Sequence, residues 1–217
     1  MKRVKVLVLL GVAVAITVGC GNQTANDPLA FVEKVEKGEA FVKKAAATDF
    51  TKVDGRLALF EGDTVKTSDS SEALIRFATG AVTRLMPNTQ FEMKPLKIAQ
   101  TDQKIVYTRL VQGIAYFYVE KTKEGAKKFE VETERAIASI KGTIFKLAQD
   151  KDKTTLTVSE GKVQFLQKSE GKTLDVEAFQ EATIGPDGIN GPSKANFMTD
   201  SFLTDAPPPS FFNAVGK

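Results

Sequence analysis

The chain has 217 residues, with 30 lysines and arginines against 27 aspartates and glutamates, one cysteine and no histidine. The absence of histidine excludes Ser-His-Asp and Cys-His nucleophilic catalysis, the usual zinc sites and a histidine proton shuttle. A single cysteine excludes an internal disulfide framework. Carboxylates and lysines remain for acid–base or hydrolytic chemistry. We therefore expect a protein that is not an enzyme and that uses neither a metal nor an organic cofactor.

The N-terminal segment is typical of a secretory signal peptide. Basic residues at 2, 3 and 5 precede a continuous apolar run over residues 6–18. Thirteen apolar residues are fewer than the roughly 20 that cross a bilayer as a helix. A leader of this kind is removed on export. The alternative is an uncleaved membrane anchor or a buried helix.

The end of this segment suggests a lipid attachment site. Thr17-Val18-Gly19-Cys20 resembles the lipobox of bacterial lipoproteins, with Thr17 where leucine is usual. The resemblance implies that residues 1–19 are cleaved as the signal peptide and that Cys20 is acylated, for instance with palmitate. We therefore expect an exported protein, held by lipid at the cell envelope on the periplasmic or outer-membrane side.

Cleavage also changes the charge balance. Three cationic residues lie in the leader and no acid does, so the remaining 198 residues hold 27 charges of each sign. A chain without net charge has no electrostatic footprint for a phosphate backbone, so we expect no nucleic-acid partner. Its length suffices for one domain with a sizeable core. Fifteen phenylalanines and no tryptophan make phenylalanine the expected bulky core residue.

Residues 20–30 are predicted to be a lipidated polar spacer. The pattern that follows, up to Val42, is ambiguous on its own. Leu29, Val32 and Val35 fit a helical stripe, whereas an interruption at Gly38 suits two strands.

From Arg56 onward the pattern predicts many short strands with turns between them. In one of them Phe129, Val131 and Thr133 alternate with glutamates, which is typical of a strand with one wet face. Residues 159–162 join two apolar runs and predict a tight hairpin at Gly161. The expected fold class is all-β, as a sandwich, a barrel or a short solenoid.

Residues 190–217 are predicted to form an extended tail, because they contain three consecutive prolines and scattered glycine and serine. The tail also carries Phe197, Phe202, Phe211 and Phe212. These side chains either pack back onto the domain or form a strip that binds a partner.

Five motifs, in this order along the chain, resemble those of the FecR domain family. They are Gly62–Thr67 with Ser71–Phe77 and Gly80, then Gly113–Tyr116, Phe129–Thr133, Ile140–Phe145, and Leu156–Val163. The resemblance implies a FecR-like β domain over residues 31–189. It also favours strands in the ambiguous segment around Gly38, because members of the family begin with a strand, a glycine and a second strand.

The structural motif residues that we single out are Gly62, Asp63, Gly142, Thr143 and Gly161. Glycine, aspartate and threonine are preferred turn residues, so we expect structural roles at strand entries and turns for all of them. No catalytic constellation is apparent among them.

The family resemblance implies a domain that faces the envelope, usually in regulators that relay an outer-membrane signal to a sigma factor. Only five residues precede the apolar run, and little sequence follows Gly188. We therefore expect this chain to carry the FecR-like domain as an interaction module and not to control a sigma factor directly.

Three functions remain open. The first is a non-enzymatic interaction module for an envelope protein or the cell wall, in which Tyr107, Tyr116, Phe117 and Tyr118 either line a surface or pack in the core. The second is a relay to a separate membrane partner or a sigma/anti-sigma system. The third is a glycan hydrolase that uses Glu130, Glu132 and Glu134, although a row of like charges is inexpensive only when it is exposed.

Overall fold

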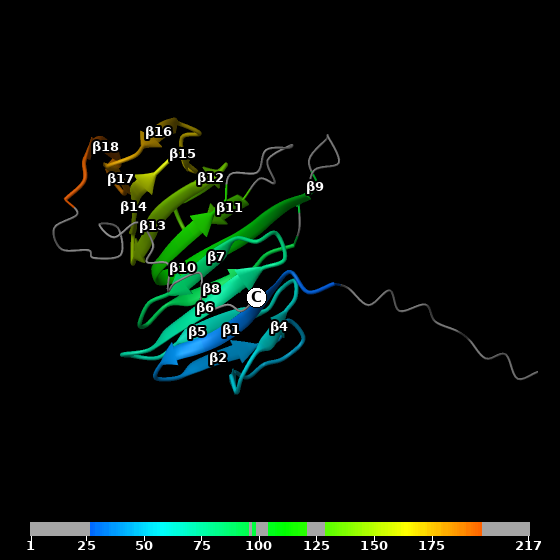
Figure 1. The fold of residues 1–217 in the computed structure, drawn as a ribbon. Coiled ribbons are helices and arrows are strands. Elements are labelled where there is room, and N and C mark those ends of the chain that lie inside the picture. The colour runs from blue at the N-terminus through cyan, green and yellow to red at the C-terminus, as the bar shows by residue number, and fades with distance from the viewer. Residues whose placement is uncertain (1–26, 96, 99–103, 121–128, 197–217) are drawn as a thin grey trace, which may run out of the picture.

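The computed structural model describes residues 27–95, 97–98, 104–120 and 129–196. The described residues form 18 strands and no helix, which confirms the all-β prediction. Figure 1 shows these strands stacked along one body, from β1 and β4 at one end to β18 at the other.

The strands vary from two to sixteen residues in length. In chain order they are β1 Ala30–Lys37, β2 Ala40–Lys43, β3 Thr51–Lys52, β4 Leu57–Leu59, β5 Thr64–Thr67, β6 Glu72–Phe77, β7 Val82–Leu85, β8 Gln90–Met93, β9 Lys97–Ile98, β10 Lys104–Val119, β11 Phe129–Glu132, β12 Ala136–Ile140, β13 Thr143–Asp150, β14 Lys153–Glu160, β15 Lys162–Gln167, β16 Thr173–Glu177, β17 Gln180–Gly185 and β18 Gly188–Lys194.

The two-residue strand β9 pairs with the start of β10, and the other strands pair into two layers. The first layer has the order β4-β1-β6-β7-β10-β13-β14-β17-β18. The second has the order β3-β2-β5-β8-β10-β11-β12-β15-β16. All of these pairings are antiparallel except that of β10 with β11, which is parallel.

Strand β10 belongs to both layers, and it changes layer at Gly113. Before this glycine, β10 pairs with β8 and β11 of the second layer. From Gly113 to Val119 it pairs with β13 of the first layer, and β7 flanks part of the same stretch. The Gln112–Gly113 interruption in the sequence is therefore the point where one long strand passes from layer to layer.

Two threonines satisfy the backbone at this crossing. The Thr89 hydroxyl donates to the Ile114 carbonyl at 3.0 Å and accepts from the Ile114 amide at 3.1 Å. The Thr89 amide donates to the Thr67 hydroxyl at 2.9 Å, which in turn donates to the Met86 carbonyl at 2.7 Å. Because both threonine side chains are buried, these bonds replace the ladder contacts that the strand loses as it changes layer.

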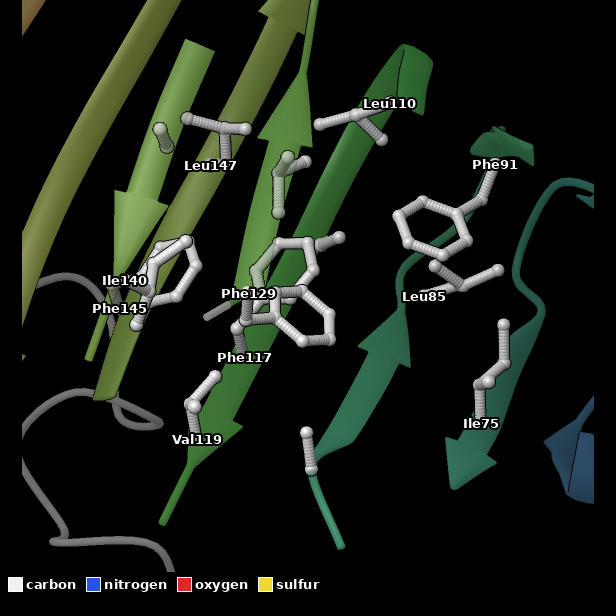
Figure 2. Packing of buried hydrophobic residues seen from close by; sticks show 14 of the residues in the cluster. Ile75, Leu85, Phe91, Leu110, Phe117, Val119, Phe129, Ile140, Phe145 and Leu147 are labelled. Atoms are coloured by element: carbon white, nitrogen blue, oxygen red, sulfur yellow. The ribbon is translucent and has the colours of Figure 1, made fainter. Parts of the chain in front are cut away.

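Phenylalanines fill the space between the layers, as composition predicts. Figure 2 shows this packing, in which Phe117 and Phe145 stack at 4.6 Å between ring centroids. Phe77 of the first layer meets Phe129 of the second edge to face at 5.0 Å. Such pairs contribute about 0.5–1.5 kcal/mol each beyond their buried area. The fully buried phenylalanines are Phe77, Phe91, Phe117, Phe129, Phe145 and Phe165.

The ambiguous early segment forms two strands, as the family resemblance favours. Gly38 separates β1 from β2 and has a φ of 60°. The two strands do not pair with each other, because β1 lies in the first layer and β2 in the second.

The prediction of a hairpin at Gly161 is wrong, because β14 and β15 also lie in different layers. Strand β14 pairs with β13 and β17, whereas β15 pairs with β12 and β16. Gly161 is a corner between layers. At the other end, β18 continues to Lys194, past the domain boundary predicted at residue 189.

Gly113→Ala should destabilise the fold more than Gly80→Ala. Both glycines have a φ of 94°, so a side chain strains the backbone at either position by about 1–2 kcal/mol. A Cβ at Gly113 would also lie 2.5 Å from the Thr89 hydroxyl and 2.6 Å from its Cα, whereas nothing lies within 4 Å at Gly80. We expect an additional loss of about 1–3 kcal/mol for Gly113→Ala. Urea unfolding of both variants measures the difference, and equal losses would contradict the close approach.

Candidate functional site

The predicted lipid site, Cys20, and the phenylalanines of the tail lie outside the described residues. The structure begins at Asp27 and enters β1 at Ala30. The five motif residues of the β domain are all described.

Asp63 forms the center of the first motif. Its carboxylate is buried and accepts hydrogen bonds from the Lys44 ammonium at 2.8 Å, the Ala45 amide at 3.1 Å and the Phe60 amide at 2.9 Å. Gly62, with a φ of 81°, turns the chain so that its amide donates to the Met93 carbonyl at 2.7 Å. A buried carboxylate with this many donors is an anchor for the backbone, here at the end where β2 and β4 finish and β5 starts.

Gly142, Thr143 and Gly161 form two corners that lie against each other. Gly142 leads from β12 to β13 and Gly161 from β14 to β15, each with a φ of 86°. A Cβ on Gly161 would lie 2.7 Å from the Gly142 carbonyl oxygen. The Thr143 hydroxyl donates to the Lys162 carbonyl at 3.1 Å and ties the corners together. Both corners favour glycine for its φ, and Gly161 requires it for the close approach as well.

A hollow of about 210 Å³ lies over these corners. Its lining residues are Tyr118, Val119, Glu120, Gly142, Thr143, Ile144 and Glu160. Burial first, and then the charges of Glu120 and Glu160, raise the pKa of the Tyr118 hydroxyl. The hollow is smaller than the 300–1,000 Å³ typical of ligand pockets.

The glutamates of β11 are engaged by neighbouring strands. Glu130 is buried and accepts from the Ser139 hydroxyl at 3.1 Å. Glu132 accepts from the Lys168 ammonium at 2.7 Å and from the Tyr107 hydroxyl. Glu134 is exposed in the turn after the strand. The alternation that predicts a buried face at Phe129, Val131 and Thr133 is confirmed, but the opposite face is wet only in part.

Electrostatics at Glu132 follow from these contacts. Burial opposes ionisation, but the hydrogen bonds from Lys168 and Tyr107 outweigh it and hold the pKa of Glu132 below its ordinary value. In the same contact, burial and then the Glu132 carboxylate raise the pKa of the Tyr107 hydroxyl above its usual range. Both groups are therefore in their ordinary charge states at neutral pH and hold β10, β11 and the end of β15 together.

The aromatic set of β10 does not form one surface. Phe117 is fully buried in the core. Tyr116 and Tyr118 alternate with it and so point to the outer side of the first layer. Tyr107 precedes the crossing and lies in the second layer, beside Glu132.

One feature that sequence patterns did not indicate is a pair of exposed phenylalanines near lysines. Phe50 and Phe60 are 38% and 37% exposed. The Lys43 ammonium lies 5.7 Å from the Phe50 ring centroid, and the Lys44 ammonium 5.4 Å from that of Phe60. Lys43 and Phe50 are seven residues apart and Lys44 and Phe60 are sixteen apart, and neither spacing is a sequence signal for a contact.

The described residues include no group of three acidic, histidine or cysteine side chains placed to hold a metal ion. In the same part of the chain, no helix is long and apolar enough to cross a membrane.

Residues 63–164 match the family model described as FecR protein. These residues form a FecR domain. Four of the five predicted motif residues lie inside the match, and Gly62 directly precedes it. No curated protein matches the chain. Strands β1 to β4 and β16 to β18 extend the two layers of the FecR domain on either side.

Two crystal structures share this fold. Both are of a protein from Parabacteroides distasonis ATCC 8503 that is proposed to be an anti-sigma factor, at 2.50 and 1.65 Å resolution. Each has a TM-score of 0.53 and 17% sequence identity to this chain over 64% of its length. The chain covers 63% and 64% of those two proteins. At this identity the similarity concerns the fold alone.

The contact between Lys168 and Glu132 predicts a pH dependence of stability. Because the native pKa of Glu132 is lowered, its contribution is present above the ordinary pKa of 4.5 and is lost as the pH falls through the native value. Lys168→Met should therefore reduce the free energy of unfolding at pH 7, by about 1 kcal/mol or less, and by a smaller amount at pH 3. Urea unfolding of both proteins at the two pH values tests this.

Lys172→Met is the matched control, because the Lys172–Glu170 ion pair is exposed on both sides. It should leave stability unchanged at either pH. A Lys168→Met effect that is equal at pH 7 and pH 3 would show that the pair acts through packing alone.

Proposed function

We propose that this protein is a lipid-anchored envelope protein whose FecR domain binds another envelope protein or a cell-wall component without catalysing a reaction. The observation that carries the proposal is the FecR match over residues 63–164. Members of this family take part in envelope regulation. In this chain the motif residues form turns at the corners of the sandwich. The fold thus accounts for the residue types found at the motif positions.

The proposed lipid anchor lies in the N-terminal segment of the chain. A basic start, an apolar run too short to span a bilayer and Gly19-Cys20 support cleavage and acylation at Cys20. One acyl chain gives only reversible membrane binding, and two or more give a lasting anchor. The protein would then be exported and would face the periplasm or lie at the outer membrane.

The described residues support binding over catalysis. Glu130 and Glu132, two of the three glutamates considered for a glycan hydrolase, are engaged by Ser139, Lys168 and Tyr107. The hollow over the corners is small, and the whole chain lacks histidine. The outer sides of two layers and their edge strands are the surfaces available to a partner.

A signalling relay is the second candidate function. The fold shared with the proposed anti-sigma factor favours it, together with the FecR match. In that case the domain would sense an envelope state and pass it to a separate membrane protein.

Acylation is tested with Cys20→Ser. Cells grown with radiolabelled palmitate should label the wild-type protein, and Cys20→Ser should abolish labelling because no other cysteine exists in the chain. Fractionation should move the variant from the envelope membranes to the soluble envelope fraction. Thr17→Leu, which brings the segment closer to the lipobox, is the control and should label at least as well as wild type. Equal labelling of Cys20→Ser would overturn the anchor.

The partner is tested by crosslinking in cells followed by mass spectrometry. Capture of an outer-membrane or cell-wall protein supports the interaction module, and capture of a sigma or anti-sigma factor supports the relay. Cys20→Ser serves as the control, since release from the membrane should deplete the specific crosslinks. Recovery of cytosolic proteins alone would contradict both candidates.

A further inference from the structure

We propose that the end of the sandwich that carries Phe50 and Phe60 rests on the surface of a zwitterionic phospholipid bilayer. This inference relies on the proposed acyl anchor at Cys20 and adds a second, direct contact between the folded domain and the membrane. It gives the FecR domain a fixed orientation.

The two phenylalanines lie at the end of the fold where the chain enters. Strand registers place the start of β1 opposite the end of β4, at Ala30 and Leu59, and the end of β2 opposite the start of β5, at Lys43 and Thr64. The Lys44 ammonium joins the two layers at this end, with the Ala58 carbonyl at 2.7 Å and Asp63 at 2.8 Å. Phe60 directly follows Leu59, whose carbonyl accepts from the Leu29 amide at 2.9 Å.

The length of the connection brings this end close to the membrane. Leu29 is nine positions after Cys20, so the connection spans about 30 Å at most when fully extended. A third exposed phenylalanine, Phe179, is 62% exposed and lies between β16 and β17, near the opposite end of the strand order (Figure 1). An anchor at Cys20 therefore favours contact through Phe50 and Phe60.

The chemistry of the pair suits an interface between lipid and water. Each ring is partly exposed, with a lysine ammonium within 6 Å of its centroid. A lysine can extend its apolar stem along apolar surface and keep its charge in water, so the Phe50 ring can enter the headgroup region while Lys43 stays at the phosphate level. The Lys44 ammonium stays bound to Asp63 and the Ala58 carbonyl, so the Phe60 ring would enter beside this ion pair.

Charge does not drive this contact. Three cations of this end are matched by carboxylates in the ion pairs Lys44–Asp63, Lys52–Glu39 and Arg56–Glu33, and Lys43 lies beside Phe50. Asp49 and Asp54 add exposed negative charge. An attraction to anionic lipid would require an excess of lysine or arginine, so the contact should form on zwitterionic lipid and resist salt.

Single tryptophans test the proposal, because the chain has none of its own. Phe50→Trp, Phe60→Trp and the control Phe179→Trp are made in the full chain, expressed in cells and purified from the envelope. Each is reconstituted into phosphatidylcholine vesicles whose acyl chains carry bromine, a short-range quencher. We expect emission of F50W and F60W to fall by about half or more and to shift to the blue, with F179W unaffected. Raising the salt to 0.5 M should leave this unchanged.

Equal quenching of all three variants, or none in any, overturns the proposal. So does quenching that requires anionic lipid. Failure of the acyl anchor is detected separately, because the vesicles then carry no protein on flotation. In that event the Cys20 thiol of the unacylated full chain is coupled to a maleimide lipid, which supplies the tether chemically, and the same quenching pattern decides whether this end contacts the bilayer.

Discussion

The fold depends on the passage of one strand through two sheets. Strand β10 pairs in the second layer up to Gln112 and in the first layer from Gly113, so it fixes the position of each layer relative to the other. A strand that leaves its ladder exposes polar backbone inside the protein, which is costly unless every group finds a partner. Thr89 provides those partners for Ile114, and Gly113 provides the close approach that Thr89 needs. The core of phenylalanines can then form against two layers whose register is already set.

The same physics explains the FecR motif. Gly142 and Gly161 are corners between layers, and Thr143 joins them through the Lys162 carbonyl. Asp63 ties three donors together at another corner. Such positions tolerate few residues because the backbone is left-handed or the carboxylate is buried, so they produce a recognisable pattern without taking part in chemistry. The surfaces between the corners are under no such constraint, and binding specificity can vary there while the fold is retained.

Local features of the fold were predictable and long-range ones were not. Alternation in Phe129, Val131 and Thr133 reports which face is buried, because it depends on one strand alone. The turn at Gly161 was visible, but whether it closes a hairpin depends on the partners of β14 and β15, which lie elsewhere in the chain. The engagement of Glu132 by Tyr107 and Lys168 spans 25 and 36 residues. No local pattern records contacts of that kind, so a row of glutamates looked more exposed than it is.

A membrane contact at Phe50 and Phe60 would decide which surfaces a partner meets. The strand order of both layers would then lead away from the bilayer, and β16 and β18 would lie farthest from it. Within the described residues each of these strands pairs with one neighbour, β15 and β17 respectively, so each presents an open edge. Pro192 lies within β18, Asp175 lies within β16 and Lys172 directly precedes β16. Proline and charged residues at an edge strand discourage non-specific pairing with other strands. A partner strand that matches these interruptions would be selected over others, because backbone hydrogen bonds give affinity while side-chain fit gives specificity.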